Sequence, residues 1–500
     1  MATSPLRIPA RLLLALAAAV VLALTAGVAA PTPAVAATKD PRLAEKLTSV
    51  LSDSRVRTAR TSVVVLDAAD GSELYGRYAW RGTTPASNTK ILTAAAAMKT
   101  LGPGYRFKTQ VIIRATPANG VVHGYLYLKG YGDPTTVVSD YRSLARQVAA
   151  RGITRVTGKL VADATFFDSD RYNANWSTSY QSDYYAAQIS ALTVAPNRDY
   201  DSGTVVVKYR PGAKKGSRAK IRISPASAAS YVKIVNKMTT SASGSRGWVS
   251  VSRRNATNTI TVSGRIPLGR STQKEWVTVD KPELYAAAVF RSELAKVGVR
   301  IDGSSKIGAT PTTRRRQVAL DRSMPLSSLL VPFLKLSNNM HAEHLTKTMA
   351  TLKGGRGNWS DGLKITMAYV RSTGAPMDGT RLVDGSGLSR ANKITPRAMG
   401  RVLFAVQNES WFPAFYAALP VAANADRMVG GTLRSRMRGT RAAGNAHAKT
   451  GTLTGVTALS GYVRGRDGRR YVFAMLSEHS GASPRPVEDK LVVALANWRR

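Results

Sequence analysis

The chain has 500 residues, of which 44% are apolar and 20% are charged, and its 72 Lys and Arg against 30 Asp and Glu give a formal net charge of +42. This composition excludes a chain that is disordered throughout, and the length predicts roughly two to four domains. Cysteine is absent, which excludes disulfide frameworks, thiolate metal sites and cysteine nucleophiles.

The N-terminus carries the pattern of a secretory signal. Arg7 and Arg11 precede an uncharged stretch over 12–30, and residues 31–36 end in Ala-Val-Ala. This order predicts a signal peptide over residues 1–36, although the apolar run is also long enough for an uncleaved single-span anchor. We therefore expect an exported, extracytoplasmic protein that is secreted or associated with the cell wall.

The positive charge favours anionic partners. Basic residues are spread along the chain, apart from a cluster at 314–316, and a solvated cationic surface accounts for most of them. Aromatic residues make up 7% of the chain, too few for a row of base-stacking platforms. Together with export, this argues against nucleic acid and leaves anionic wall polymers as candidate partners.

Taken in chain order, the hydrophobic patterns predict an α/β domain that is split in sequence, with a β-rich insertion between its halves. The insertion covers about 105–315 and has turns rich in Ser and Gly. The predicted helices are 88–101, 138–150, 282–297, 327–334, 342–352, 361–371 and 487–498. The predicted strands are 62–66, 74–75, 110–113, 125–128, 204–209, 220–224, 248–252, 259–263, 457–463 and 470–476.

A Ser-x-x-Lys motif opens the first long helix. Ser87 follows Pro85-Ala86, and Lys90 lies three residues later, so both side chains return to one face of the helix. A hydroxyl beside an amine is a nucleophile with a candidate base. The spacing alone is common, because Ser230 with Lys233 and a third pair at 271 and 274 also match it, and a helix cap is the alternative role of Ser87.

Two further motifs lie in the second half of the chain. Ser337-Asn338-Asn339 offers a second hydroxyl and an amide, and Lys449-Thr450-Gly451-Thr452 opens a predicted strand. A strand with a cation, a hydroxyl and a Gly suits pairing with an extended peptide that ends in a carboxylate. Each motif is weak by itself, but their order along the chain is the signature of penicillin-binding proteins and class A β-lactamases.

The residues around the motifs resemble the D-alanyl-D-alanine carboxypeptidase/endopeptidase branch of low-molecular-mass (class C type) penicillin-binding proteins. The resemblance rests on 85–90, 336–343, 449–453 and the segment Asp384-Gly385-Ser386-Gly387-Leu388-Ser389-Arg390. Ser87 and Ser337, which begin the first two motifs, are 337 − 87 = 250 positions apart, whereas β-lactamases of this fold have a far shorter interval. The resemblance implies a penicillin-binding, β-lactamase-like serine transpeptidase fold, with a five-stranded antiparallel sheet flanked by helices.

The resemblance also implies how the chain is divided. We expect a catalytic domain over 37–104 plus 316–500, an inserted domain over 105–207 plus 265–315, and a second inserted β-rich domain over 208–264.

The same resemblance implies hydrolysis of peptidoglycan stem peptides through an acyl-enzyme, without a cofactor or metal. Ser87 would attack the carbonyl between two D-alanines, Lys90 would take its proton, and Ser337 would pass a proton to the leaving amine. Lys449 would lower the pKa of Lys90 and, with Thr450, meet the terminal carboxylate. Asn339, Thr450, Gly451, Thr452 and Arg390 would bind substrate, and the backbone N–H groups of Ser87 and Thr452 would form an oxyanion hole. β-Lactams would acylate Ser87, and the acyl group would be released slowly, because no extra Glu for deacylation is evident.

Several alternatives stay open at this point. A serine β-lactamase and a non-catalytic cationic wall-binding protein fit parts of the pattern. His341 and His344 could share a helix face and bind a metal, although no third ligand is evident, and His123, His447 and His479 are isolated. Some relatives carry an acidic residue three positions after a Trp in the insertion, whereas here Trp176 is followed by Ser179, with Asp183 further on.

Overall fold

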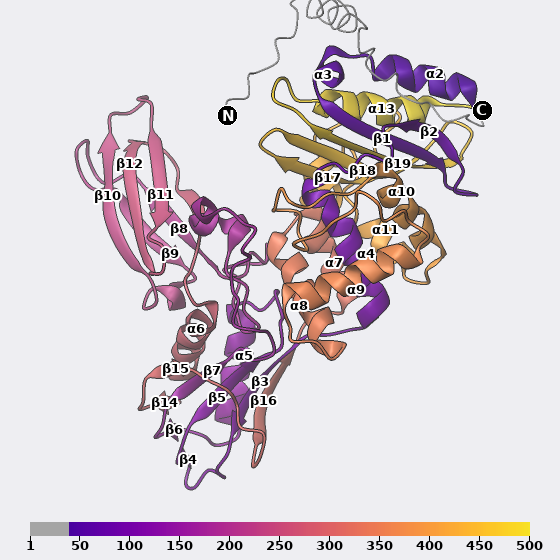
Figure 1. Ribbon diagram of the computed structural model, residues 1–500. Helices are drawn as coiled ribbons and strands as arrows, with labels where there is room; N and C mark the ends of the chain where they lie inside the picture. The colour runs from indigo at the N-terminus through magenta and orange to yellow at the C-terminus, as the bar shows by residue number, and fades with distance from the viewer. Residues whose placement is uncertain (1–39) are drawn as a thin grey trace, which may run out of the picture.

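The computed structural model describes residues 40–500, so the predicted signal peptide lies outside the described residues. The main unit is built on a five-stranded antiparallel sheet with strand order β17-β18-β19-β1-β2 (Figure 1). Its strands are β1 (Arg60–Asp67), β2 (Glu73–Arg77), β17 (His447–Leu453), β18 (Val456–Arg464) and β19 (Arg470–Glu478). Strands from the two ends of the chain therefore meet where β1 pairs with β19.

Helices cover both faces of this sheet, as predicted. Alternate residues of β1 face opposite ways, so Val63 packs with the terminal helices and Val64 packs with the central ones. The terminal helices are α2 (Pro41–Val50), α3 (Ser54–Arg57) and α13 (Arg485–Asn497). The others are α4 (Thr89–Leu101), α7 (Leu326–Lys335), α8 (Asn339–Leu352), α9 (Trp359–Ser372), α10 (Pro396–Ala405), α11 (Phe412–Ala418) and α12 (Arg427–Gly430).

The insertion forms two further groups of strands. In the first, a mixed sheet of order β15-β7-β5-β3-β16 and a small sheet β14-β6-β4 accompany two long helices, and we name this group the α5–α6 unit. Its elements are β3 (Lys108–Ile113), β4 (Val121–Val122), β5 (Leu126–Gly130), α5 (Val138–Ala150), β6 (Arg155–Val156), β7 (Leu160–Asp163), α6 (Pro282–Lys296), β14 (Arg300–Ile301), β15 (Ser305–Ile307) and β16 (Arg316–Arg322).

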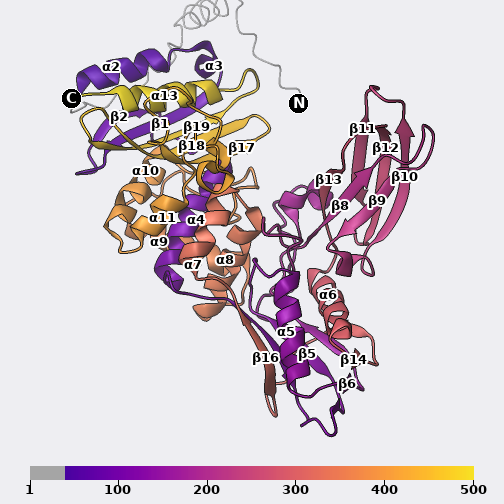
Figure 2. The same ribbon diagram turned by 180° about the vertical axis from the view of Figure 1, so that it is seen from behind.

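The second group, residues 204–278, holds two three-stranded sheets and is named the β-rich unit. Their orders are β13-β8-β9 and β10-β12-β11, and they form a separate lobe in both views (Figures 1 and 2). The strands are β8 (Thr204–Arg210), β9 (Lys220–Ser224), β10 (Lys233–Ser241), β11 (Trp248–Arg253), β12 (Thr259–Pro267) and β13 (Gln273–Thr278). Strands β10 and β13 were not predicted from the sequence, because their partly exposed residues give weak apolar alternation.

Strand pairing shifts the predicted domain boundaries. The limits at 207/208 and 264/265 cut through β8 and β12, and β8 also pairs with β13. Strand β16, assigned from sequence to the catalytic domain, pairs with β3 instead. Because a hydrogen-bonded ladder holds its strands in one sheet, we propose that β8 to β13 form one inserted domain and that β16 belongs to the other.

The segment between β7 and β8 returns to the main unit. Phe167, Trp176 and Ile189 pack in one apolar cluster with Met340 and Trp359 of helices α8 and α9. This contact fixes the insertion against the helices of the main unit. Within residues 40–500, no helix is both long and apolar enough to span a bilayer.

Candidate functional site: a cleft with two lysine–serine pairs

The first pair lies at the start of α4. A single 3₁₀ turn over Ala86–Asn88 precedes this helix, and Ala86 has a left-handed backbone with φ 45°. This turn places Ser87 one helical turn before Lys90, and the Lys90 Nζ atom lies 2.8 Å from Ser87 Oγ. The predicted pairing of hydroxyl and amine is therefore present in the structure.

Lys90 is fully buried and reaches two further oxygens. Its Nζ donates to Asn339 Oδ1 at 2.6 Å and to the Ser386 carbonyl at 2.8 Å. Burial lowers the pKa of Lys90 to about 7, although the negative charges of Glu343 and Asp384 oppose this shift. Near neutral pH a large fraction of this amine is therefore unprotonated.

The second pair joins a turn between α7 and α8 to strand β17. Ser337 has a left-handed backbone with φ 61°, and its Oγ lies 2.8 Å from Lys449 Nζ. Lys449 also donates to the Thr450 carbonyl at 2.8 Å and is fully buried. Burial, together with the positive charge of Lys90, holds the pKa of Lys449 well below its ordinary value.

These two pairs open into one cleft, which we name the serine cleft. Ser87, Ser337 and Asn339 line it, together with three tyrosines of the insertion. The lining residues are Ser87, Tyr180, Tyr184, Tyr185, Leu336, Ser337, Asn339, Gly387, Leu388, Thr432, Thr450, Thr452, Leu453 and Thr454. Its volume of about 420 Å³ is in the range of small-molecule and peptide pockets.

The predicted substrate residues of β17 occupy different positions. Thr450 and Thr452 line the cleft, and the hydroxyls of Thr450 and Thr432 lie 2.7 Å apart. Gly451 instead packs against the turn that carries Ser87, because a Cβ atom there would lie 2.6 Å from the Pro85 carbonyl oxygen. The missing side chain of Gly451 therefore allows β17 to approach that turn.

Asn339 and Arg390 make contacts that the sequence did not predict. Asn339 Nδ2 donates to the Tyr185 carbonyl at 2.8 Å while its Oδ1 accepts from Lys90, so both ends of the amide are occupied. Arg390 donates to the Thr454 carbonyl at the edge of the cleft and does not itself line it. Asn339 thus links Lys90 to the insertion.

A buried pair of carboxylates near Lys90 was missed as a functional feature. Glu343 accepts from Trp359 Nε1 at 2.7 Å, from Gly385 N at 3.0 Å and from Ser386 N at 2.8 Å. These bonds fix the loop whose Ser386 carbonyl accepts from Lys90. The sequence signal was present, since Glu343 lies in a quoted motif, but nothing local indicates which backbone it reaches.

Asp384 holds the other side of the same loop. It accepts from Gly387 N at 2.7 Å, from Ser389 N at 2.6 Å and from Trp176 Nε1 at 2.9 Å. Burial, followed by the neighbouring Asp384, raises the pKa of Glu343 to about 7, and burial also raises the pKa of Asp384. Trp176 of the insertion therefore supports the loop that orients Lys90.

The remaining polar residues named from sequence lie elsewhere. His341 Nε2 lies 3.2 Å from the Tyr200 carbonyl and His344 Nδ1 lies 2.9 Å from the Gly132 carbonyl, so the two imidazoles face different loops. Residues 40–500 contain no group of three His, Asp or Glu side chains that could hold a metal ion. Asp183 accepts a hydrogen bond from the Tyr185 hydroxyl at 2.7 Å, beside the cleft.

The chain is similar to known proteins over most of its length. Residues 43–498 match the family described as D-Ala-D-Ala carboxypeptidase 3 (S13). The chain is 38% identical over 472 residues to a D-alanyl-D-alanine carboxypeptidase of Actinomadura sp. (strain R39), covering 93% of this chain and 87% of that protein. It is 27% identical over 452 residues to the carboxypeptidase DacB of Mycolicibacterium smegmatis, covering 86% and 79% of the two chains.

A solved structure shares the fold. The crystal structure of penicillin binding protein 4 (dacB) from Haemophilus influenzae superposes with a TM-score of 0.77 at 22% identity, covering 90% of this chain and 99% of that one. The same protein in complex with a β-lactam gives a TM-score of 0.72 at 22% identity, with 91% and 99% covered. The insertions are therefore part of a shared architecture.

Proposed function

The chain belongs to the D-Ala-D-Ala carboxypeptidase 3 (S13) family, and from this premise we propose that it is a serine-type carboxypeptidase that releases D-alanine from peptidoglycan stem peptides. The observation that carries the proposal is the convergence of Ser87, Lys90, Ser337 and Lys449 at one cleft. The R39 relative is named for this activity.

The contacts of Lys90 indicate how it activates Ser87. A neutral amine has two N–H groups and one lone pair. Asn339 Oδ1 and the Ser386 carbonyl can only accept, so they take the two N–H groups. The lone pair then faces Ser87 Oγ, which can donate its proton as the hydroxyl attacks the substrate carbonyl.

Ser337 and Lys449 provide the second proton path. The substrate nitrogen must be protonated as its bond to the carbonyl carbon breaks. Ser337 Oγ can give its proton to that nitrogen and recover one from the protonated form of Lys449, to which it is hydrogen-bonded. Thr450 and Thr452, with the Lys449 charge when present, would bind the terminal carboxylate, and the Ser87 and Thr452 N–H groups would stabilise the oxyanion.

β-Lactams are proposed as covalent inhibitors rather than substrates. They would acylate Ser87 as a D-Ala-D-Ala terminus does, and the Haemophilus influenzae protein of the same fold is described in complex with a β-lactam. After D-alanine departs, Lys90 can activate water to release the stem-peptide acyl group, whereas a ring-opened β-lactam keeps its leaving amine in the cleft and needs a further base for rapid turnover. The oxygens of Glu343 and Asp384 are already bonded to N–H groups, and neither residue lines the cleft. This favours slow release and argues against a β-lactamase.

A labelling experiment tests the proposal. A fluorescent penicillin should attach to Ser87, identified by peptide mass, and the Ser87→Ala variant should lose both labelling and D-alanine release. Ser230→Ala is the matched control, since Ser230 also begins a Ser-x-x-Lys pattern but lies in the β-rich unit away from the cleft. Unchanged D-alanine release by Ser87→Ala would favour the non-catalytic wall-binding alternative, and rapid penicillin turnover would favour a β-lactamase.

The substrate form and the location complete the proposal. Cross-linked wall fragments, analysed by mass, distinguish release of terminal D-alanine from cleavage of cross-links, which would use the same nucleophile. We also propose that the protein is exported, because its N-terminal sequence has the signal pattern and a stem peptide lies outside the cytoplasmic membrane.

A further inference from the structure

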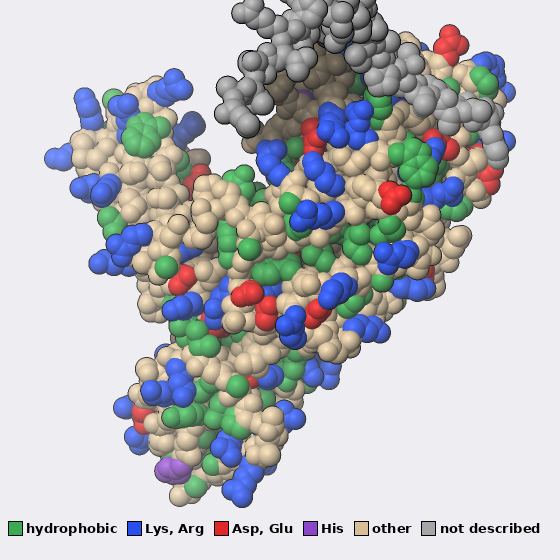
Figure 3. Space-filling model, in the orientation of Figure 1, with side chains coloured by type: hydrophobic (Ala, Val, Ile, Leu, Met, Phe, Trp, Pro, Cys, Tyr) green, Lys and Arg blue, Asp and Glu red, His purple; other side chains and the backbone are tan. Residues whose placement is uncertain are grey.

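Positive charge is concentrated in the β-rich unit. Over residues 204–278, fifteen side chains are Lys or Arg and one, Glu275, is acidic, so this lobe holds one third of the net charge of the chain. On the face seen in Figure 3, Lys and Arg side chains project all around the lobe that holds β10, β11 and β12. Like charges at this density repel one another and lower the stability of the compact state.

No ion pair within the described residues neutralises these cations. Every ion pair found in residues 40–500 joins residues outside 204–278. The three arginines Arg246, Arg265 and Arg270 are exposed, and their guanidinium groups have neither an ion pair nor a hydrogen bond with the protein. Their donors are therefore available to an external anion.

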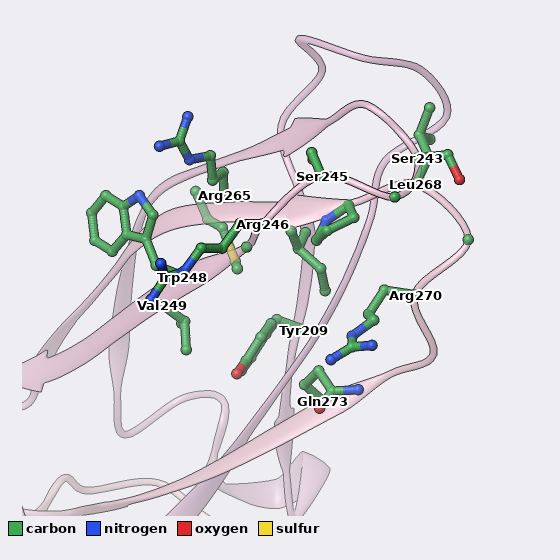
Figure 4. A pocket seen from close by; sticks show the side chains of 16 residues that line it. Tyr209, Ser243, Ser245, Arg246, Trp248, Val249, Arg265, Leu268, Arg270 and Gln273 are labelled. Carbon is green, nitrogen blue, oxygen red and sulfur yellow. The ribbon is translucent and has the colours of Figure 1, made fainter.

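These arginines line a cavity of about 640 Å³ in the β-rich unit. Trp248 lies directly opposite Arg265 in the β11–β12 ladder, and 54% of its surface is exposed. Figure 4 shows Trp248 and Arg265 rising from the strands side by side and Arg246 close to the base of Trp248, with Arg270 and Gln273 across the cavity. The cavity thus combines the flat apolar face of an indole with separate guanidinium groups.

We propose that this cavity binds an anionic glycopolymer, a sugar chain that carries carboxylate or phosphate groups. The guanidinium forks match such groups in shape and charge, and the indole offers an apolar face to the C–H face of a sugar ring. A site that attracted anions by charge alone would not need an exposed Trp beside its arginines. The site lies in a different lobe from the serine cleft, so it would hold the wall while the cleft remains open to stem peptides.

The test measures binding of size-defined, labelled polygalacturonate to the mature protein at physiological salt. Arg246→Gln/Arg265→Gln/Arg270→Gln should raise the Kd at least about tenfold, because charge-assisted bonds are lost. Lys214→Gln/Lys215→Gln/Lys233→Gln removes the same charge from exposed positions of the same unit that do not line the cavity, and should raise the Kd less than about threefold.

A second variant separates the glycopolymer from other polyanions. Trp248→Ala should weaken polygalacturonate binding about threefold or more but leave binding of linear polyphosphate, which has no sugar ring, unchanged. Equal losses in the two triple variants, or no effect of Trp248→Ala, would overturn the proposal. Tighter binding to phosphatidylglycerol vesicles or duplex DNA than to polygalacturonate would also overturn it.

The outcome is independent of the catalytic proposal. The cavity variants should keep the wild-type rate of penicillin acylation and a Tm no lower than that of the wild type, which shows that a change in Kd comes from the cavity. Loss of polymer binding with intact acylation supports the site. A failure of the serine mechanism would instead appear in Ser87→Ala while polymer binding stays unchanged.

Discussion

The serine cleft and the β-rich unit use positive charge in opposite ways. In the cleft, Lys90 and Lys449 are fully buried, each reaches a serine hydroxyl, and burial lowers the pKa of both. In the β-rich unit, Arg246 and Arg265 stay exposed and have no ion pair or hydrogen bond with the protein. Burial thus converts a cation into a base, whereas exposure keeps it available to bind an anion.

The largest effect on acylation is expected from Lys90→Met, which removes the amine and keeps the apolar stem. The rate of acylation by penicillin should fall roughly 10³- to 10⁴-fold, because Ser87 loses the base at 2.8 Å. Stopped-flow acylation measures the loss, and an unchanged Tm excludes unfolding. A loss smaller than about tenfold would mean that another group takes the proton.

The next largest effect is expected from Glu343→Gln, which changes how the rate of acylation depends on pH. Wild-type acylation should fall as the pH drops through about 7, where Lys90 gains a proton. In Glu343→Gln the negative charge that raises the pKa of Lys90 is lost, so this fall should move to lower pH.

The plateau rate of Glu343→Gln should also decrease, by about 10- to 100-fold, because a Gln amide leaves one N–H donor of the 385–386 loop unpaired. The pH profile of acylation separates this effect from simple instability, which would change the Tm without moving the profile. A profile that keeps its wild-type midpoint would contradict the role of Glu343 as a positioning residue.

A smaller effect is expected where the two halves of the cleft pack together. Gly451→Ala places a Cβ atom 2.6 Å from the Pro85 carbonyl, so β17 or the Ser87 turn must shift. We expect a loss of about 1–3 kcal/mol in the free energy of unfolding. Gly104→Ala is the matched control, since a Cβ there meets no atom within 4 Å, and denaturant unfolding of both variants decides the point.

The smallest effect should come from the exposed cations. Lys214→Gln/Lys215→Gln should change the free energy of unfolding by less than about 0.5 kcal/mol, because neither side chain has a partner to lose. Penicillin acylation should stay at the wild-type rate. A destabilisation above about 1 kcal/mol would show that these lysines contribute to the fold, contrary to the contrast drawn above.

Much of the fold was predictable because its signals are local. The helix over 138–150 and the strands that became β18 and β19 follow from apolar periodicity and flanking turn residues. Strand β10 was missed because its alternation is weak, and the pairing of β8 with β13, which crosses the predicted limit at 207/208, could not be seen in the sequence. Pairing between strands that are distant in the chain cannot be predicted from the residues of either strand alone.

The sequence by itself determined which chemical groups the site contains. Ser87 with Lys90, and the motifs at 337–339 and 449–452, are readable because spacing within one turn or strand fixes which side chains share a face. Only the tertiary structure decided what surrounds them. Trp176, Tyr185 and Glu343 reach the cleft or its supporting loop from segments far apart in the chain, since burial and hydrogen bonds between such segments exist only after folding.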